Sequence, residues 1–257
     1  MKGLLLKDYY CIKHNLISFL CLTIGVIVIG VLFAVSIHYG NMADVVETMV
    51  AEEGMTAESV YDLFRLGVWL VLLIPMAYVG NVTDCFKADQ SANFGKQIFS
   101  MPVNPVQMVG ARYLACLLYA GLSFAGSFFA AICVSFATNQ YPLSELLAVT
   151  ITFGAALLIY LSIVMMLLYL FGTQYADTIL AVPLLIVMIV GGVYIVMKLE
   201  HLGGAQEDAL MSNIWGSIKG FLTQYAGILC VIALVILILS FFASVKIVEK
   251  RRAKAIC

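Results

Sequence analysis

Charged residues are scarce in this chain: they make up 11% of its 257 residues, against about 25% in an average soluble domain. Hydrophobic residues make up 63%, and the mean hydropathy is +1.04. Too few polar side chains remain to cover the surface of a water-soluble domain of 28.0 kDa. The composition therefore excludes a soluble enzyme, a disordered chain and a disulfide-rich secreted domain. It predicts a protein that is solvated by the lipid bilayer.

Motifs of catalytic and metal chemistry are lacking as well. The seven cysteines include no C-x-x-C pair, and the three histidines are scattered without an H-E-x-x-H motif. The Gly95-Lys96 pair is not part of a Walker A loop, because Gln90 stands where the first Gly of that loop belongs. We expect this chain to have no catalytic residue, no metal site, no cofactor of its own and no nucleic-acid partner.

Long uninterrupted apolar stretches are what the sequence has instead. A transmembrane helix needs about 20 predominantly apolar residues. Six stretches fit this requirement: 16–38, 64–82, 106–137, 146–171, 177–198 and 221–245. Their apolar residues are continuous rather than alternating, which disfavours a β-barrel. The sequence predicts an all-α membrane protein with six transmembrane helices in a single domain over 1–257.

Lysine and arginine are distributed unequally between the two sides of this bundle. With the N-terminus inside, only Arg65, Lys198 and Lys219 lie on the outer side. The inner segments hold Lys2, Lys7, Lys13, Lys87, Lys96, Arg112, Lys246, Lys250, Arg251, Arg252 and Lys254. Because cytoplasmic segments are enriched in these residues, we expect both termini to be cytoplasmic.

Two segments outside the spans are predicted to be amphipathic helices. In 1–16, apolar residues fall at i, i+4, i+7 and i+11 from Leu5, which is typical of a helix in the membrane interface. An ordinary basic overhang is the alternative. In the outer loop 199–220, apolar residues at helical spacing around Trp215 indicate an amphipathic or shallow re-entrant helix.

The inner loop 83–105 is the only long cytoplasmic connection. Phe94, Ile98 and Met101 form an apolar stripe at i, i+4 and i+7, and the charged residues of the loop include Asp89 and Lys96. An apolar stripe in a cytoplasmic loop requires a membrane surface or a protein to cover it. We favour a protein partner.

Proline and capping residues mark where helices start and bend. Asn104 is a good N-cap, Pro105 suits the first helical position, and Gln107 lies three residues after the cap. The third span is therefore expected to begin abruptly at Asn104. Pro75 and Pro183 lie within the second and fifth spans, where they are expected to kink the helices.

These features resemble a type-2 ABC exporter permease. The resemblance rests on the opening Met1–Asp8, on six spans with both ends inside, and on the run from Phe99 to Leu114. That run is similar to the family's Ser-Leu-Pro-Val … Ile-Val … Lys-Tyr-Leu. Met101, Pro105 and Arg112 occupy places where the family commonly has Leu, a basic residue and Lys.

The resemblance implies that the segment of about 89–103 is a coupling helix, which docks into a cleft of a separate ATPase subunit. The residues expected to make this contact are Asp89, Phe94, Lys96, Ile98, Phe99, Met101 and Pro102. Members of the family assemble from two permease halves, either two copies or two paralogues, and two ATPases that hold ATP and magnesium. The family builds its translocation path mainly from the first, second and fifth spans, between the two halves.

A path without charges favours an amphipathic or hydrophobic cargo. Among relatives of this kind, the chain resembles exporters of cytolytic peptides such as the phenol-soluble modulins, and antimicrobial-peptide immunity pumps, in the bacterial plasma membrane. Two other hypotheses remain open at this point. One is a membrane scaffold or immunity protein that transports nothing, and the other is a secondary carrier.

Overall fold

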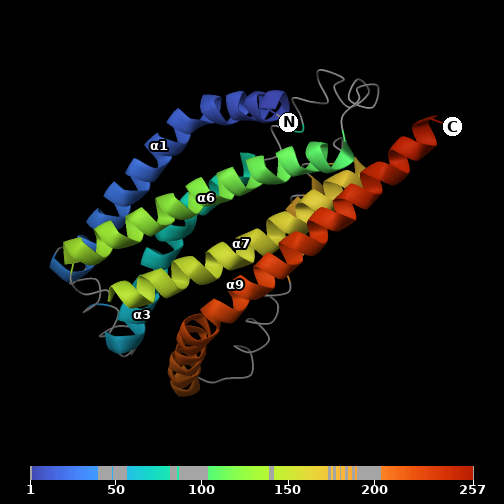
Figure 1. The fold of residues 1–257 in the computed structure, drawn as a ribbon. Helices are drawn as coiled ribbons and strands as arrows, with labels where there is room; N and C mark the ends of the chain where they lie inside the picture. The colour runs from blue at the N-terminus through green and yellow to red at the C-terminus, as the bar shows by residue number, and fades with distance from the viewer. Residues whose placement is uncertain are drawn as a thin grey trace.

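The computed structural model is helical throughout the part of the chain that it describes (Figure 1). The described residues are 2–39, 48, 57–81, 86, 104–138, 142–172, 175, 178–179, 181–182, 185–186, 189 and 204–256. The elements are α1 (Lys2–Tyr39), α3 (Ala57–Leu73), the 3-10 helix η1 (Ile74–Asn81), α6 (Pro105–Thr138), α7 (Leu143–Phe171) and α9 (Gly204–Ile256).

Within the described residues, four helical segments are long and apolar enough to cross a membrane. They are Leu16–Ser36, Pro105–Ala137, Leu143–Phe171 and Gln224–Ala253, and a shorter apolar segment covers Phe64–Val79. These segments overlap the first, third, fourth, sixth and second predicted spans, in that order. The predicted span 177–198 lies mostly outside the described residues. The all-helical, multi-pass character is confirmed, and the number of six spans stays a prediction.

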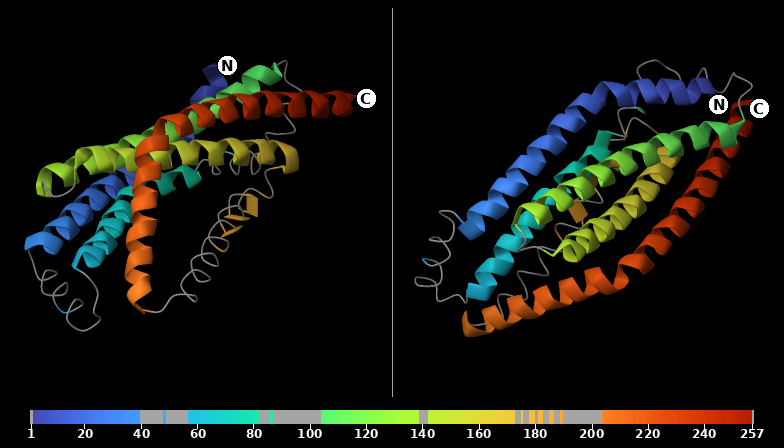
Figure 2. Two further views of the ribbon diagram at one scale, coloured as in Figure 1. Left: turned by 90° about the horizontal axis from the view of Figure 1, so that it is seen from below. Right: turned by 60° about the vertical axis from the view of Figure 1, so that its left-hand side comes forward.

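Helices α1, α3, α6 and α7 alternate in direction along the bundle, and α9 runs in the same direction as α7 (Figures 1 and 2). The starts of α1 and α6 and the ends of α7 and α9 therefore lie at one end, which we call the termini end. The opposite end, where the connection between α6 and α7 lies, is the far end. The main helix pairs are α7 with α9, α1 with α6, α6 with η1 and α6 with α7. Helix α6 is thus the central element of the described bundle.

Buried apolar side chains form two clusters along the bundle. The first joins α6, α7 and α9 with η1 and with Phe19 of α1, and it also includes Tyr78, Phe86, Val109, Tyr113, Tyr119, Leu161, Met165, Leu168, Val245 and Val248. The second joins α1, α3, α6 and α7 and includes Val26, Ala34, Val68, Trp69, Leu72, Ala130, Val134, Leu146 and Val149. The two clusters hold different sets of helices together, and α1, α6 and α7 belong to both sets.

The two predicted amphipathic helices are continuous with neighbouring spans. Helix α1 runs without a break from Lys2 into the first span, and it bends on the way (Figure 1). Helix α9 likewise includes most of the predicted outer helix 199–220 and bends before it continues as the last span (Figure 2). No proline lies near either junction, so nothing in the backbone forces the helix to end there.

The second span changes its helix type at a proline. Helix α3 ends at Leu73 and η1 begins at Ile74, directly before Pro75. Proline has no N–H to donate, so an α-helical hydrogen bond is lost at this position. At Pro75, the predicted kink, the structure shows a change from α-helical to 3-10 geometry. Pro183, the other predicted kink, lies outside the described residues.

Helix α6 approaches α1 and η1 closely at one glycine. A Cβ atom added to Gly126 would lie 3.0 Å from Phe19 Cζ, 3.2 Å from Thr23 Oγ1 and 3.4 Å from Pro75 Cβ. Small residues permit such close approach between membrane helices, where van der Waals contact replaces the hydrophobic effect as the main attraction. A Cβ at Gly121, on the same helix, would meet nothing within 4 Å.

This difference gives a matched pair of variants. Gly126→Ala should lower the free energy of unfolding by about 1–3 kcal/mol, because the methyl group overpacks the contact with α1 and η1. Gly121→Ala should leave stability unchanged or raise it slightly, since alanine favours a helix over glycine. Thermal melting of both variants in one detergent measures the effect, and equal melting temperatures would contradict the packing described here.

Candidate functional site

The predicted ATPase-docking segment is described only at its borders. Asp89, Phe94, Lys96, Ile98, Phe99, Met101 and Pro102 all lie outside the described residues. Phe86 before the segment and Asn104 after it are described, and both belong to the termini end of the bundle. The candidate site is therefore built from these two borders and the helices that hold them.

Asn104 lies at the exact start of helix α6. The Val106 N–H donates a hydrogen bond to Asn104 Oδ1 (3.1 Å), and the Gln107 N–H donates to the Asn104 carbonyl oxygen (2.9 Å). This is the geometry of an N-cap, with Pro105 as the first helical residue. Both Asn104 and Gln107 are exposed. The cap fixes the place where the chain leaves the segment and becomes helical.

Phe86, on the other border, is buried in the bundle with 5% of its surface exposed. Its ring lies edge-on to that of Tyr169 on α7, with centroids 6.2 Å apart. The guanidinium carbon of Arg112, on α6, lies 5.1 Å from the Phe86 ring centroid, within the range of a cation–π contact. We call Phe86, Arg112 and Tyr169 the anchor cluster. It connects the start of the segment to α6 and α7.

The last turn of α7 is held from a second side by α9. Arg251 donates a hydrogen bond from its guanidinium to the Leu170 carbonyl oxygen (2.7 Å). Carbonyls in the last turn of a helix have no partner within the helix, and a cation there also complements the helix dipole. The chain then turns at Gly172, which has φ +98 and donates its N–H to the Leu168 carbonyl oxygen (3.0 Å).

A polar network inside the bundle joins three helices next to the anchor cluster. The Tyr113 hydroxyl of α6 lies 2.7 Å from Ser240 Oγ and 2.9 Å from Ser244 Oγ of α9. Ser240 also donates to the carbonyl oxygen of Ser162 on α7. All four residues are buried. Hydrogen bonds between membrane helices stabilise their packing by about 0.6 kcal/mol each on average.

These contacts show what the termini end can do mechanically. Both ends of the segment 87–103 are fixed to the bundle, one by the anchor cluster and the other by the start of α6. Arg112 and Tyr113 are neighbours on α6, so the anchor cluster and the polar network share one turn of helix. A displacement of the segment would therefore be passed directly to α6 and α7, and through them to α9.

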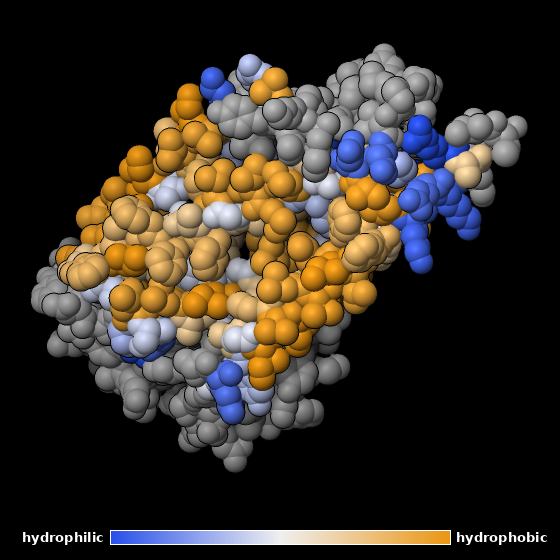
Figure 3. Space-filling model, viewed as in Figure 1, coloured by the Kyte–Doolittle hydropathy of each residue, from blue (hydrophilic) through white to orange (hydrophobic). Residues whose placement is uncertain are grey.

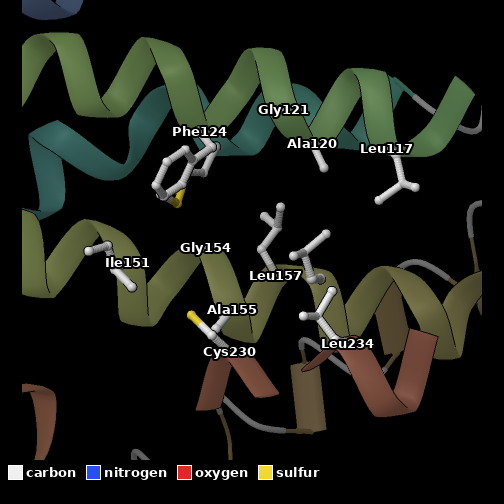
Figure 4. Close-up of a pocket in the computed structure, with 12 residues that line it drawn as sticks. Leu117, Ala120, Gly121, Phe124, Ile151, Gly154, Ala155, Leu157, Cys230 and Leu234 are labelled. Atoms are coloured by element: carbon white, nitrogen blue, oxygen red, sulfur yellow. The ribbon is translucent and has the colours of Figure 1, made fainter. Parts of the chain in front are cut away.

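A cavity of about 380 Å³ lies between the helices near the middle of their length (Figure 4). It is lined by Met76 of η1, by Leu117, Ala120, Gly121 and Phe124 of α6, by Ile151, Gly154, Ala155, Leu157 and Leu158 of α7, and by Cys230 and Leu234 of α9. The lining contains no charged residue, and its volume lies in the range of small-molecule sites. The cavity suits an apolar group.

At the far end of the bundle an ion pair joins two of the described spans. Arg65 Nε of α3 lies 3.5 Å from Glu145 Oε1 in the first turn of α7, and Glu145 is only 5% exposed. A carboxylate in the first turn of a helix is also favoured by the helix dipole. The pair therefore ties α3 to α7 at the end of the bundle opposite the anchor cluster.

Sequence reasoning identified the cap but not the anchor cluster. In the sequence, Arg112 is distinguished by its charge on the inner side and by its place in the family-like run, and neither Phe86 nor Tyr169 stands out. The available signal was a large aromatic residue directly before a polar loop, together with a basic residue shortly after the following span begins. In the described part of the chain, no group of three or more His, Cys, Asp or Glu residues could hold a metal ion.

Comparison with known protein families identifies the chain. A family model described as an ABC-2 family transporter protein matches residues 55–249. No curated protein and no solved structure matches the chain. The matched region includes α3, η1, α6 and α7, the whole candidate site except Arg251, and most of α9. The chain therefore belongs to the ABC-2 family of transporter proteins.

Proposed function

We propose that this chain is the membrane subunit of an ATP-driven exporter, which docks a separate ATPase through the segment of about 89–103. Both termini would be cytoplasmic, as the excess of Lys and Arg at the termini end favours. Membership of the ABC-2 family implies an ATPase partner in general. The finer assignments that follow concern how that partner is coupled and what is moved.

One observation carries the coupling assignment: both borders of the docking segment are fixed to the bundle. Phe86 is buried against Tyr169 and Arg112, and Asn104 caps α6. A segment that only joined two helices would not need a buried aromatic side chain at one border. A segment can pass the motion of a bound partner to the helices only if its borders are attached to them. A loosely tethered loop would absorb that motion.

The proposed assembly contains two membrane subunits and two ATPases. The second membrane subunit is another copy of this chain or a paralogue, and the complex lies in the bacterial plasma membrane. ATP and magnesium are held by the ATPases, so this chain is not catalytic on its own. Closure of the ATPases on ATP would displace the docking segment and thereby the inner ends of α6 and α7.

The proposed cargo is amphipathic or hydrophobic, such as a cytolytic or antimicrobial peptide. Two features support this choice. The spans described here carry no charged residue near their middle, and the cavity between α6, α7 and α9 is apolar. Transfer of a charged or strongly polar cargo into such surroundings would be costly. The apolar side of an amphipathic peptide would meet no such penalty.

The docking assignment is tested by placing charges on the segment. The double variant Phe94→Asp/Ile98→Asp should no longer co-purify with the ATPase from detergent, because desolvating two carboxylates opposes burial in a cleft. The control Phe94→Leu/Ile98→Leu keeps both positions apolar and should retain the ATPase. Retention of ATPase binding and ATP-dependent export by the Asp variant would show that the partner docks elsewhere or is not needed.

The anchor cluster is tested by separating docking from transport. Phe86→Leu removes the ring that contacts Arg112 and Tyr169 but leaves the docking segment intact. We expect the variant to bind the ATPase normally and to export several-fold less cargo per ATP hydrolysed. Phe86→Tyr keeps the ring and should retain most of the coupling. Undiminished export per ATP in Phe86→Leu would exclude a coupling role for this contact.

The cargo class is tested in vesicles that contain both subunits. ATP should drive accumulation of an amphipathic helical peptide but not of a hydrophilic peptide of equal length. Gly121→Leu, which extends into the open space beside the cavity, should reduce accumulation several-fold. The control is Gly227→Leu, at a position that also has nothing within 4 Å but does not line the cavity. Equal transport of both peptides would contradict the proposed cargo.

A further inference from the structure

Helix α9 has one face that stays exposed along most of its length. This face carries Ile228, Val235, Leu239 and Phe242, and Leu239 and Phe242 have exposed fractions of 64% and 60%. At the next turn, with the same helical spacing, the face continues as Lys246 and Lys250, which are also exposed. Figure 3 shows this change from hydrophobic to hydrophilic side chains along α9 towards the C-terminus.

The opposite face of α9 is the one that packs into the bundle. Ser240, Ser244, Val245 and Val248 are all buried. On a helix with 3.6 residues per turn, Lys246 and Lys250 lie about half a turn away from Ser244 and Val248. We call Lys246 and Lys250 the lysine stripe.

The other basic residues of this region have different roles. Arg251 bonds to the Leu170 carbonyl of α7, and Arg252 is half-buried. One acidic residue, Glu249, is exposed at the edge of the lysine stripe. The stretch from 246 to 252 therefore has a net positive charge, and the cations not engaged with the bundle are the lysines.

The depth of the lysine stripe follows from the Arg251 contact. Leu170 belongs to the last turn of α7, so Arg251 lies level with the end of that span. Lys246 precedes Arg251 by five residues, which places it about 7 Å closer to the middle of the membrane on a straight helix. A water-soluble protein does not reach that depth beside a lipid-facing helix. A lysine side chain can extend from there to the level of lipid headgroups.

We propose that the lysine stripe of α9 binds the phosphate groups of anionic phospholipids in the leaflet at the termini end. The charges are complementary, and the apolar face that leads to the stripe lies along the acyl chains. The proposed orientation of the exporter makes this the cytoplasmic leaflet. Only this assignment of the leaflet rests on the proposed function. Binding there stabilises the end of α9, which in turn holds the last turn of α7.

A second copy of this chain is a less favourable occupant of the same face. Two copies related by a two-fold axis in one membrane place the same helix end at the same depth. The lysine stripes would then face each other, and like charges in contact would oppose the association. Anionic lipid avoids this repulsion, because it brings the opposite charge.

The test measures lipid binding to the full-length chain without an ATPase, so its result does not depend on the exporter assignment. Native mass spectrometry from detergent, with added phosphatidylglycerol or phosphatidylcholine, gives the two affinities. The wild-type chain should prefer phosphatidylglycerol, and Lys246→Gln/Lys250→Gln should weaken its binding by about tenfold or more. Lys246→Arg/Lys250→Arg keeps the charge and should keep the preference. Lys13→Gln, at an exposed lysine of α1, is the control for general charge.

Several outcomes would overturn the proposal. One is an equal affinity of the wild-type chain for both lipids, and another is an unchanged preference in the Gln variant. Displacement of phosphatidylglycerol by an equal concentration of glycerol phosphate would show a site for soluble phosphate rather than lipid. A change of oligomeric state in the Gln variant, with lipid binding unchanged, would show a subunit interface. The melting temperature of the Gln variant without added lipid should equal that of the wild type, which confirms that it is folded.

Discussion

The start of helix α6 is the constraint on which the termini end depends. Asn104 caps the helix and Pro105 begins it, so the helix cannot start earlier or later without loss of the cap. Two turns further on, Arg112 contacts Phe86, and Tyr113 bonds to two serines of α9. A shift of α6 by one residue would rotate both side chains by about 100° and break both sets of contacts. The cap therefore fixes the register of the anchor cluster and of the polar network together.

Packing within a bilayer explains why these particular contacts matter. Lipid tails are as apolar as leucine, so exposed apolar residues on α9 do not drive the helices together. Attraction instead comes from close backbone approach, as at Gly126, and from hydrogen bonds such as those of Tyr113. The Gly126 contact joins α6 to α1 and η1, whereas the Tyr113 bonds join α6 to α9. Local changes at one of them can therefore alter the relative positions of whole helices, which suits a protein that must move.

The sequence predicted the features that depend on local chemistry. Apolar stretches gave the positions of the described spans, and Asn104 and Pro105 gave the start of α6, because a cap is decided by neighbouring residues. The contacts of Phe86 with Tyr169, of Arg251 with Leu170 and of Arg65 with Glu145 join residues more than 75 positions apart. A single sequence can point to individual residues that could make such contacts, but it does not show which of them pair. The described parts of the predicted helices 1–16 and 199–220 are continuous with their spans. Amphipathic patterning shows which face of a helix is apolar and not where the helix ends.

The last turn of α7 is where the two proposed interactions meet. Tyr169 contacts Phe86, at the border of the docking segment, and the adjacent Leu170 accepts a hydrogen bond from Arg251, at the level of the lysine stripe. A force on the proposed docking segment would reach α7 through the first contact, and α9 would resist or follow through the second. Lipid headgroups held by Lys246 and Lys250 would restrain α9 at this point and would give the moving helices a fixed reference in the membrane. The efficiency of coupling should then depend on the lipid of that leaflet, although no lipid takes part in ATP hydrolysis.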